Sequence, residues 1–185
     1  MKRFFACFLI LTVLVAIDQV SKLVIAHYFV NADMVLIPDI LRFRPVLNTY
    51  LNWIASIIEY KTPVWFMIAA QIFSLAIAFL YYRYLSYLWA QGRKFLNGMV
   101  VFLTAGIMCS FVDVVFWGGS LDFLRLFDWF TFDLKDVYLN VGVISALIFC
   151  VNYYLKKYSK LSKEERRQTS ILLWIRKCML SSARE

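Results

Sequence analysis

Four long apolar stretches dominate the hydrophobic pattern of the chain. They cover approximately residues 4–29, 64–80, 95–117 and 137–154, and polar or mixed segments separate them. The hydrocarbon core of a bilayer is about 30 Å thick, and a helix of about 20 apolar residues crosses it. Because the apolar residues form continuous blocks of about this length, the pattern predicts an all-α integral membrane protein with four transmembrane helices.

The basic residues are distributed unevenly between the two ends of these predicted helices. One side carries Lys2, Arg3, Arg83, Arg93, Lys94 and every basic residue from Lys156 onward, whereas the other carries Arg42, Arg44, Lys61, Arg125 and Lys135. Cytoplasmic loops of membrane proteins are enriched in lysine and arginine. We therefore expect both termini in the cytoplasm and the segments 30–61 and 118–136 on the extracytoplasmic face.

The two outward segments differ in pattern. Residues 30–61 mix apolar and charged positions and contain Pro38 and Pro45, which predicts a small β-like platform between the first and second helices. Thr62 and Pro63 at its end predict an N-cap followed by the first residue of the second helix. Residues 118–136 are rich in aromatic side chains, and we expect them to lie in the membrane interface.

The last part of the chain is a basic tail. We divide the chain into a four-helix membrane domain, residues 1–158, and a cytoplasmic tail, residues 159–185. Ser162 and Glu165 have the spacing of a capping box, and an apolar run with basic neighbours follows them. This pattern favours an interfacial helix on the membrane surface, with a disordered tail as the alternative.

Composition narrows the possible partners. The chain is 62% hydrophobic, with a mean hydropathy of +0.68 and a net charge of +8. Because the topology explains where the basic residues lie, we expect membrane lipids and no nucleic acid as partners. Cys7, Cys109 and Cys150 lie inside apolar stretches, and His27 is the single histidine, so we expect no metal site and no cofactor.

Ionisable residues inside the predicted helices are the candidates for chemistry, because lipid makes them costly. Asp18 and Lys22 in the first helix are four positions apart and share one face. Two interpretations remain open for this pair. Either the two charges neutralise each other while Lys22 snorkels to the surface, or the pair orders a site or contacts a lipid headgroup.

A second candidate consists of two aspartates near the outer membrane surface. Asp113 lies near the outer end of the third helix and Asp136 at the start of the fourth, so the predicted topology places both at one depth. Two close carboxyl groups in a poorly hydrated place share a proton, as in aspartic proteases. In the alternative, Asp136 only caps its helix and Asp113 is an interfacial anchor.

Around these residues the sequence resembles the bacterial lipoprotein signal peptidases, or signal peptidase type II. The resemblance covers most of the first 155 residues. Its motifs, in order, are Asp18-Gln19-Val20-Ser21-Lys22, similar to D-Q-x-x-K; Val46-Leu47-Asn48-Thr49, similar to V-x-N-T; Ala105 to Asp113, similar to G-G-x-x-G-N-x-x-D; Asp122-Phe123, similar to D-F; and Phe132-Asp133-Leu134-Lys135-Asp136, similar to F-N-x-A-D.

The resemblance implies a membrane aspartic endopeptidase. Family members remove the signal peptide of prolipoproteins just before a diacylglyceryl-modified cysteine, and two aspartates at the outer face of the bacterial cytoplasmic (inner) membrane activate water without metal. By motif position these are Asp113 and Asp136. The resemblance also implies that residues around them bind substrate or shape the site: Asp18, Lys22, Asn48, Ser110, Asp122 and Asp133.

Several positions depart from the family pattern. Ser110 and Asp133 stand in place of asparagines, Val114 in place of an arginine, Tyr50 in place of a glycine, and Lys135 in place of a small residue. Lys135 favours the ionised form of the neighbouring Asp136, whereas Asp133 opposes it. Two alternatives to the peptidase therefore stay open: an inactive or weak relative that binds lipidated peptides or a membrane partner, and a small ion-coupled carrier.

Overall fold

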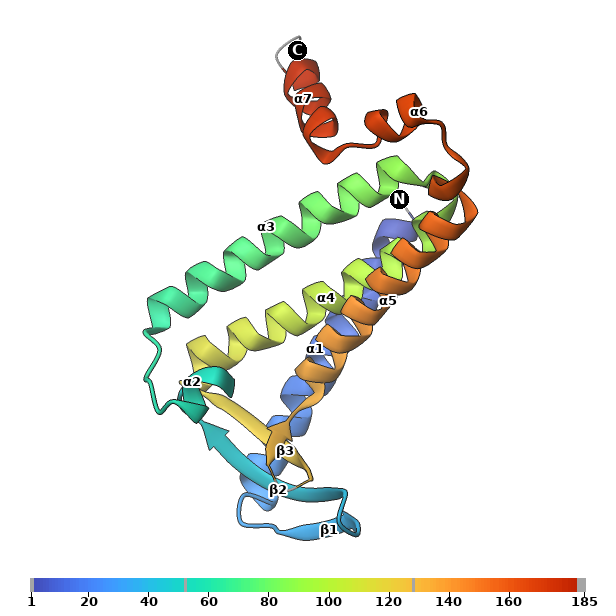
Figure 1. Ribbon diagram of the computed structural model, residues 1–185. Coiled ribbons are helices and arrows are strands. Elements are labelled where there is room, and N and C mark those ends of the chain that lie inside the picture. Colours follow the sequence, from blue (N-terminus) through green and yellow to red (C-terminus); the bar gives the residue numbers. More distant parts are fainter. Residues whose placement is uncertain (1, 52, 128, 183–185) are drawn as a thin grey trace.

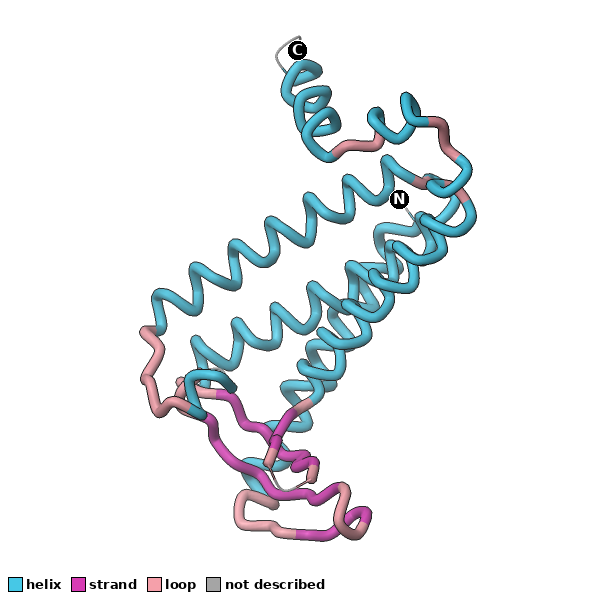
Figure 2. Tube along the Cα trace, viewed as in Figure 1, coloured by secondary structure: helices cyan, strands magenta, loops and turns pink. Residues whose placement is uncertain are grey.

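The computed structural model describes residues 2–51, 53–127 and 129–182 (Figure 1). Long helices form an elongated bundle, and a small sheet lies at one end of it (Figure 2). The start of α1 and the helices of the tail lie at the opposite end of the bundle. Which side of the membrane each end of the chain faces stays a prediction.

The bundle consists of α1 (Lys2–Tyr28), α3 (Val64–Leu88), α4 (Arg93–Val112) and α5 (Leu134–Lys156). Within the described residues, four helical stretches are long and apolar enough to cross a membrane: Phe5–Tyr28, Val64–Leu88, Phe95–Trp117 and Leu134–Lys160. The prediction of four transmembrane helices is therefore confirmed. α3 is longer than the predicted stretch because its tyrosine-rich rim remains helical as far as Leu88.

α4 is the central helix of the bundle, because it packs against α1, α3 and α5. At the end of the bundle away from the sheet, Leu85, Leu96, Met99 and Phe149 form a buried apolar cluster. The outer faces of the helices expose large apolar side chains, for example Phe73. Such a surface is unfavourable in water, whereas lipid tails cover it, as expected for spanning helices.

The sheet has four antiparallel strands in the order β1-β2-β3-β4. These are β1 (Met34–Ile37), β2 (Leu41–Asn48), β3 (Ser120–Leu126) and β4 (Phe130–Phe132). The predicted platform between the first two spanning helices is confirmed in β1 and β2. The sequence analysis assigned no strands to residues 118–136, yet this segment supplies half of the sheet. In the register between β2 and β3, Asn48 lies opposite Ser120 and Val46 opposite Asp122.

Two glycines make the turn from α4 into β3. After Val112 the helix widens into a π-helical turn, Asp113–Trp117, and Gly118 ends it with a φ of 63°, a left-handed conformation that glycine adopts without strain. A Cβ atom on the next residue, Gly119, would lie 2.8 Å from the carbonyl oxygen of Asn48. The absence of a side chain at Gly119 therefore lets β3 approach β2 directly below the π-helical turn.

The short helix α2 (Trp53–Ile57) lies between β2 and α3. The prediction that Thr62 caps α3 and that Pro63 is its first residue is wrong by one position. Pro63 is itself the N-cap, with extended backbone angles, and α3 begins at Val64. Proline suits this place because its missing N–H costs nothing before the first helical turn.

The tail folds into two helices, α6 (Lys163–Gln168) and α7 (Ile171–Ser182), after a 3-10 turn at Tyr158–Lys160; a second such turn, Ala90–Gly92, precedes α4. The predicted capping box is confirmed, because the Ser162 hydroxyl accepts a hydrogen bond from the Glu165 N–H and the Glu165 carboxylate accepts one from the Ser162 N–H. The structure thus favours the helical interpretation over disorder for the described part of the tail. Residues 183–185 of the predicted tail lie outside the described residues.

Candidate active site

The ammonium group of Lys22 lies where three separate parts of the chain meet. It is fully buried, and its Nζ atom lies 2.9 Å from Asp18 Oδ2, 2.6 Å from Asp113 Oδ2 and 2.7 Å from Asp133 Oδ2. A buried charge persists only when it is paired and hydrogen-bonded. The interpretation that Lys22 snorkels to the surface is therefore wrong, and the interpretation that the Asp18–Lys22 pair orders a site is supported.

Asp113 lies at the first position of the π-helical turn and is 1% exposed. Both of its carboxylate oxygens accept from Lys22, at 2.8 and 2.6 Å, and Oδ1 also accepts from Gln19 Nε2 at 3.1 Å. The Gln19 carbonyl in turn accepts from the indole N–H of Trp117 at 3.1 Å. Three hydrogen bonds thus hold this carboxylate directly, and the Trp117 indole orients the amide that donates one of them. π-helical turns of this kind are frequent at functional sites.

Lys135 is a second buried ammonium group in the same cluster. Its Nζ atom lies 2.5 Å from Asp133 Oδ2, 3.3 Å from Asp113 Oδ2 and 3.5 Å from Asp122 Oδ1, and it also donates to the Ser120 hydroxyl. From the sequence, Lys135 was only a departure beside Asp136. In the structure it joins the start of α5 to β3 and to the π-helical turn.

Asp133 and Asp136 form a capping box at the start of α5. Asp133 is the N-cap, and its carboxylate accepts from the Asp136 N–H at 3.3 Å, while the Asp136 carboxylate accepts from the Asp133 N–H at 3.2 Å. The N-cap of α5 is thus Asp133, and Asp136 takes part in the capping box as the third residue of the helix. Whether Asp136 does more than cap the helix stays a prediction. The same turn also brings carboxylate oxygens of Asp122, Asp133 and Asp136 within 4.8 Å of one another.

Two aspartates of the cluster, Asp122 and Asp133, lie outside the spanning segments, and their pKa values shift in opposite directions. Burial raises the pKa of Asp122 above its ordinary value, although Lys135 and the Ser120 hydroxyl act in the opposite direction. Burial also opposes ionisation of Asp133, but the ammonium groups of Lys135 and Lys22 outweigh it and hold the pKa of Asp133 below its ordinary value. Asp133 is thus the more firmly ionised of the two.

The three carboxylates around the capping box could hold a cation by their spacing alone. The ammonium group of Lys135 already contacts two of them, Asp133 at 2.5 Å and Asp122 at 3.5 Å. We therefore assign the countercharge at this place to lysine.

A cavity of about 240 Å³ opens onto the cluster. Its polar lining consists of Asn48, Ser110, Ser120, Asp122, Thr131, Lys135 and Asp136, and its apolar lining of Leu51, Met67, Phe130 and Leu139. Asp136 therefore faces the cavity, whereas Asp113 is not among its lining residues. The Ser120 hydroxyl connects the cavity with Asp113, because Ser120 lines the cavity and its hydroxyl lies 3.4 Å from Asp113 Oδ2.

The remaining predicted residues border this cavity. The Asn48 side chain accepts a hydrogen bond from the Tyr50 N–H at 3.1 Å, which holds the turn after β2. The Ser110 hydroxyl accepts from Gln71 Nε2 of α3 at 2.9 Å. All eight predicted site residues thus lie in the cluster or along its cavity.

Sequence reasoning missed five polar residues of the site as site residues: Gln19, Gln71, Ser120, Thr131 and Lys135. Gln19 stands inside a motif that was recognised, and Lys135 was noted only as a departure. Ser120 carries no local signal, because its place is set by the pairing of β3 with β2. Gln71 is a buried amide in an apolar helix, which is a signal for a polar partner on a neighbouring helix.

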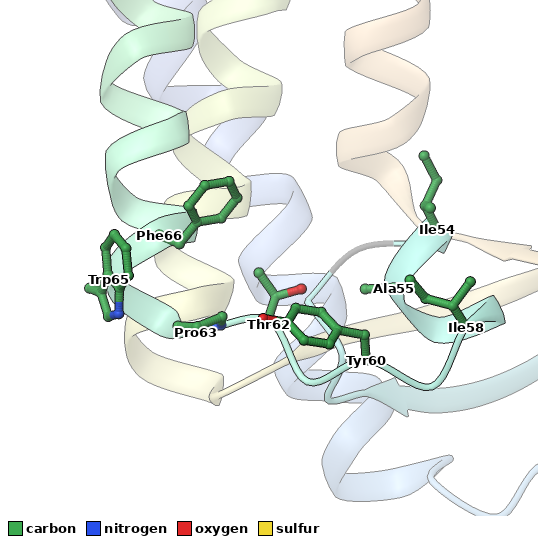
Figure 3. Close-up of a pocket in the computed structure, with 8 residues that line it drawn as sticks. All are labelled: Ile54, Ala55, Ile58, Tyr60, Thr62, Pro63, Trp65 and Phe66. Carbon is green, nitrogen blue, oxygen red and sulfur yellow. The ribbon is translucent and has the colours of Figure 1, made fainter.

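A larger, apolar cavity of about 410 Å³ lies between α2 and the start of α3 (Figure 3). Ile54, Ala55 and Ile58 of α2 line it on one side, and Trp65 and Phe66 of α3 on the other, with Tyr60, Thr62 and Pro63 from the connecting loop. It shares no lining residue with the polar cavity, so it has no part in the ionisable cluster.

Comparisons with known proteins agree with this fold. The sequence model of the family described as "Signal peptidase (SPase) II" matches residues 10–152, which contain every residue of the cluster. Comparison with curated proteins gave no match.

Two solved structures share the fold. The first, a bacterial membrane enzyme determined by the in meso method at 2.3 Å resolution, has a TM-score of 0.64 and 24% sequence identity, covering 85% of this chain and 94% of that chain. The second, a bacterial membrane enzyme determined by the same method at 1.9 Å, has a TM-score of 0.61 and 24% identity, covering 77% of this chain and 90% of that chain.

Proposed function

The chain belongs to the signal peptidase II family of membrane peptidases, and from this premise we propose that it is an aspartic endopeptidase with a catalytic pair of Asp113 and Asp136. Its proposed substrates are prolipoproteins, cleaved before a diacylglyceryl-modified cysteine. The observation that carries the proposal is that Asp113 and Asp136, from two spanning segments, join one buried cluster through Lys135 and Asp133.

The surroundings of the two aspartates suggest different roles. Asp113 has Lys22 on both oxygens, so we assign it as the ionised partner that takes a proton from the attacking water. Asp136 faces the cavity and has the carboxylates of Asp122 and Asp133 nearby, so we assign it as the protonated partner. It donates its proton to the scissile carbonyl oxygen as water attacks the carbonyl carbon. When the tetrahedral intermediate collapses, the C–N bond breaks, the leaving amine takes up the proton held by Asp113, and Asp136 recovers its proton from a hydroxyl group of the intermediate as the carbonyl re-forms.

Lys135 is proposed to position the carboxylates of this particular chain. The family pattern has an arginine directly after the first catalytic aspartate, and here that position is the buried, apolar Val114. Lys135 brings a cation to Asp113, Asp122 and Asp133 from the other side of the site. Asp133 and Lys135 together add one negative and one positive charge, so the loss of the arginine at position 114 leaves the site one positive charge short of the family pattern.

The other predicted residues are proposed to shape the site. Asp18 and Lys22 fix the orientation of Asp113. Asn48, Ser110 and Asp122 line the polar cavity, where a peptide backbone would find hydrogen-bond donors and acceptors.

The apolar cavity between α2 and α3 suits an acyl chain of the lipidated cysteine. It lies next to the start of a spanning helix and is lined by aliphatic and aromatic side chains such as Ile58 and Phe66 (Figure 3). At about 0.8 kcal/mol for each buried methylene group, even part of one acyl chain would contribute substantially to substrate binding.

The proposed location is the bacterial cytoplasmic membrane, with the sheet and both cavities on the extracytoplasmic face. The distribution of basic residues supports this orientation, since most lie at the end of the bundle away from the sheet.

Cleavage of a diacylglyceryl-modified prolipoprotein by the purified protein, in detergent or lipid, tests the proposal. We expect cleavage before the lipidated cysteine and its loss in both Asp113→Asn and Asp136→Asn. Asp39→Asn is the matched control, because Asp39 is an exposed aspartate in a turn of the sheet with a φ of 59°, which asparagine also tolerates. No cleavage by the folded wild-type protein, under conditions where a motif-complete relative cleaves, would instead indicate a binding protein of the same fold.

A further inference from the structure

A third cavity, at the opposite end of the bundle, is separate from the site of hydrolysis. It has a volume of about 340 Å³ and is lined by Tyr82, Arg83, Ser86 and Tyr87 of α3, Arg93 of α4 and Trp174 of α7. The tail helix therefore completes a cavity that α3 and α4 begin.

α7 is held on α3 by specific contacts. Trp174 is 8% exposed and packs its ring against Tyr84, with centroids 5.6 Å apart. The Tyr84 hydroxyl donates to the carbonyl oxygen of Thr169 at 2.8 Å. Lys177 reaches back over the ring of Tyr87. These contacts give the cavity a fixed wall next to the end of a spanning helix.

The cavity is strongly cationic. Two guanidinium groups, Arg83 and Arg93, belong to its lining, and none of the lining residues is acidic. Both arginines are exposed, and the structure records no ion pair between either of them and a described residue. Arg83 instead lies over the ring of Phe79. A pair of guanidinium groups beside tyrosine hydroxyls suits a phosphodiester, which guanidinium binds with two parallel hydrogen bonds.

The outer face of α7 is apolar. Ile171, Leu172 and Ile175 are 48%, 75% and 42% exposed, and their spacing places them on one continuous face of α7 next to Trp174. The next residues, Arg176 and Lys177, are basic. An apolar face bordered by cations next to the end of a spanning helix is typical of a segment that lies among lipid headgroups. The ligand of the cavity is therefore lipid-borne.

We propose that the cavity between α3, α4 and α7 binds the headgroup of an anionic phospholipid, with Arg83 and Arg93 on the phosphate and the apolar face of α7 against the acyl chains. This site anchors the tail to the membrane surface. It does not depend on the proposed peptidase activity.

Binding of phosphatidylglycerol and of phosphatidylcholine with the same acyl chains, titrated onto the full chain in detergent and counted by native mass spectrometry, tests the site. We expect preferential binding of phosphatidylglycerol. Arg83→Ala combined with Arg93→Ala should weaken the binding of phosphatidylglycerol roughly 30-fold, because each cation lost near an anionic lipid weakens binding about fivefold. Arg83→Lys with Arg93→Lys should recover part of the affinity, because the charge returns without the fork geometry.

The matched control is Lys160→Ala combined with Lys163→Ala, which removes the same charge from the same end of the molecule but from residues outside the cavity lining. We expect its affinity for phosphatidylglycerol to stay within about twofold of wild type, since only long-range attraction is lost. Equal losses in the two double variants, equal binding of the two lipids, or unchanged binding after loss of both arginines would each overturn the proposal.

Discussion

The ammonium group of Lys22 lies 2.6 Å from the Oδ2 atom of Asp113, although the two residues are 91 positions apart in the chain. The same ammonium group contacts Asp18 on its own helix and Asp133 at the start of α5. One buried cation thus ties together α1, the π-helical turn and the N-terminus of α5, and it fixes the carboxylate proposed to act as the base.

Replacement of Lys22 by methionine should therefore damage both stability and catalysis. Removal of one partner of a buried ionic network costs about 3–5 kcal/mol, because uncompensated carboxylates stay behind. A carboxylate displaced by about 1 Å can lower the rate by about 100-fold. Thermal unfolding in detergent and cleavage of the lipidated substrate measure the two effects. Lys61→Met, an exposed lysine at the same end of the bundle, is the control and should change neither.

Gly119→Ala should disturb the junction between the sheet and the site. The new Cβ atom would lie 2.8 Å from the Asn48 carbonyl oxygen, a backbone atom that cannot move without shifting β2. Overpacking of this kind costs about 1–3 kcal/mol. The comparison is Gly98→Ala on α4, where the Cβ atom meets nothing within 4 Å and better helix propensity should slightly stabilise the protein. Equal unfolding temperatures for the two variants would contradict this account.

The opposite pKa shifts of Asp122 and Asp133 predict distinct pH profiles of stability. The pKa of Asp122 is raised, so its contribution to stability is complete below 3.8, the ordinary value, and falls as the pH rises through the higher folded-state value. The pKa of Asp133 is lowered, so its contribution is present above 3.8 and is lost as the pH falls through the lower folded-state value.

Unfolding curves in detergent at a series of pH values, for Asp122→Asn and Asp133→Asn beside wild type, measure these contributions. Asp122→Asn should gain stability relative to wild type as the pH rises from 3.8 through the higher folded-state pKa of Asp122. Asp133→Asn should be less stable than wild type above 3.8, and this difference should disappear as the pH falls through the lower folded-state pKa of Asp133. Parallel pH profiles for the two variants would show that the two carboxyl groups do not differ in this way.

The spanning helices were predictable from the sequence because hydrophobic length alone decides whether a helix crosses a bilayer. The pairing of β2 with β3 was not predictable, because it joins residues such as Asn48 and Ser120 that are far apart in the chain. The local sequence pattern of a strand does not identify the strand with which it pairs. The position of Ser120 in the site follows from that pairing.

The candidate site, too, was only partly predictable from the sequence. Topology alone placed Asp113 and Asp136 at one depth, and both join the cluster. The spacing of Asp18 and Lys22 left open whether the pair neutralises itself locally, or orders a site or contacts a lipid headgroup. The contacts of Lys22 with Asp113 and Asp133 arise only when three segments pack, so they could not be predicted from a helical repeat.

Lys135 and Asp133 both differ from the family pattern and form an ion pair with each other, so the effects of replacing them on stability should be coupled. Lys135→Ala alone removes hydrogen bonds to charged groups, which are worth about 1.5–3 kcal/mol each, and it leaves Asp122 and Asp133 short of a countercharge. Asp133→Asn with Lys135→Ala restores the family residues at these two positions, but not the arginine after Asp113, and should recover part of the stability and cleavage lost in Lys135→Ala. Unfolding free energies of the two single variants and the double variant should give a coupling at the upper end of about 0.5–3 kcal/mol.

The exposed ion pair of Arg42 and Asp33, with N–O distance 2.9 Å, is the control for this cycle. Arg42→Ala with Asp33→Asn should give a coupling below about 1 kcal/mol, because solvent screens exposed charges. If the effects of the Asp133 and Lys135 substitutions simply add, then Lys135 does not compensate for Asp133. The loss of the arginine at position 114 would then be uncorrected, and the cleavage rate of wild type should be low beside that of a motif-complete relative.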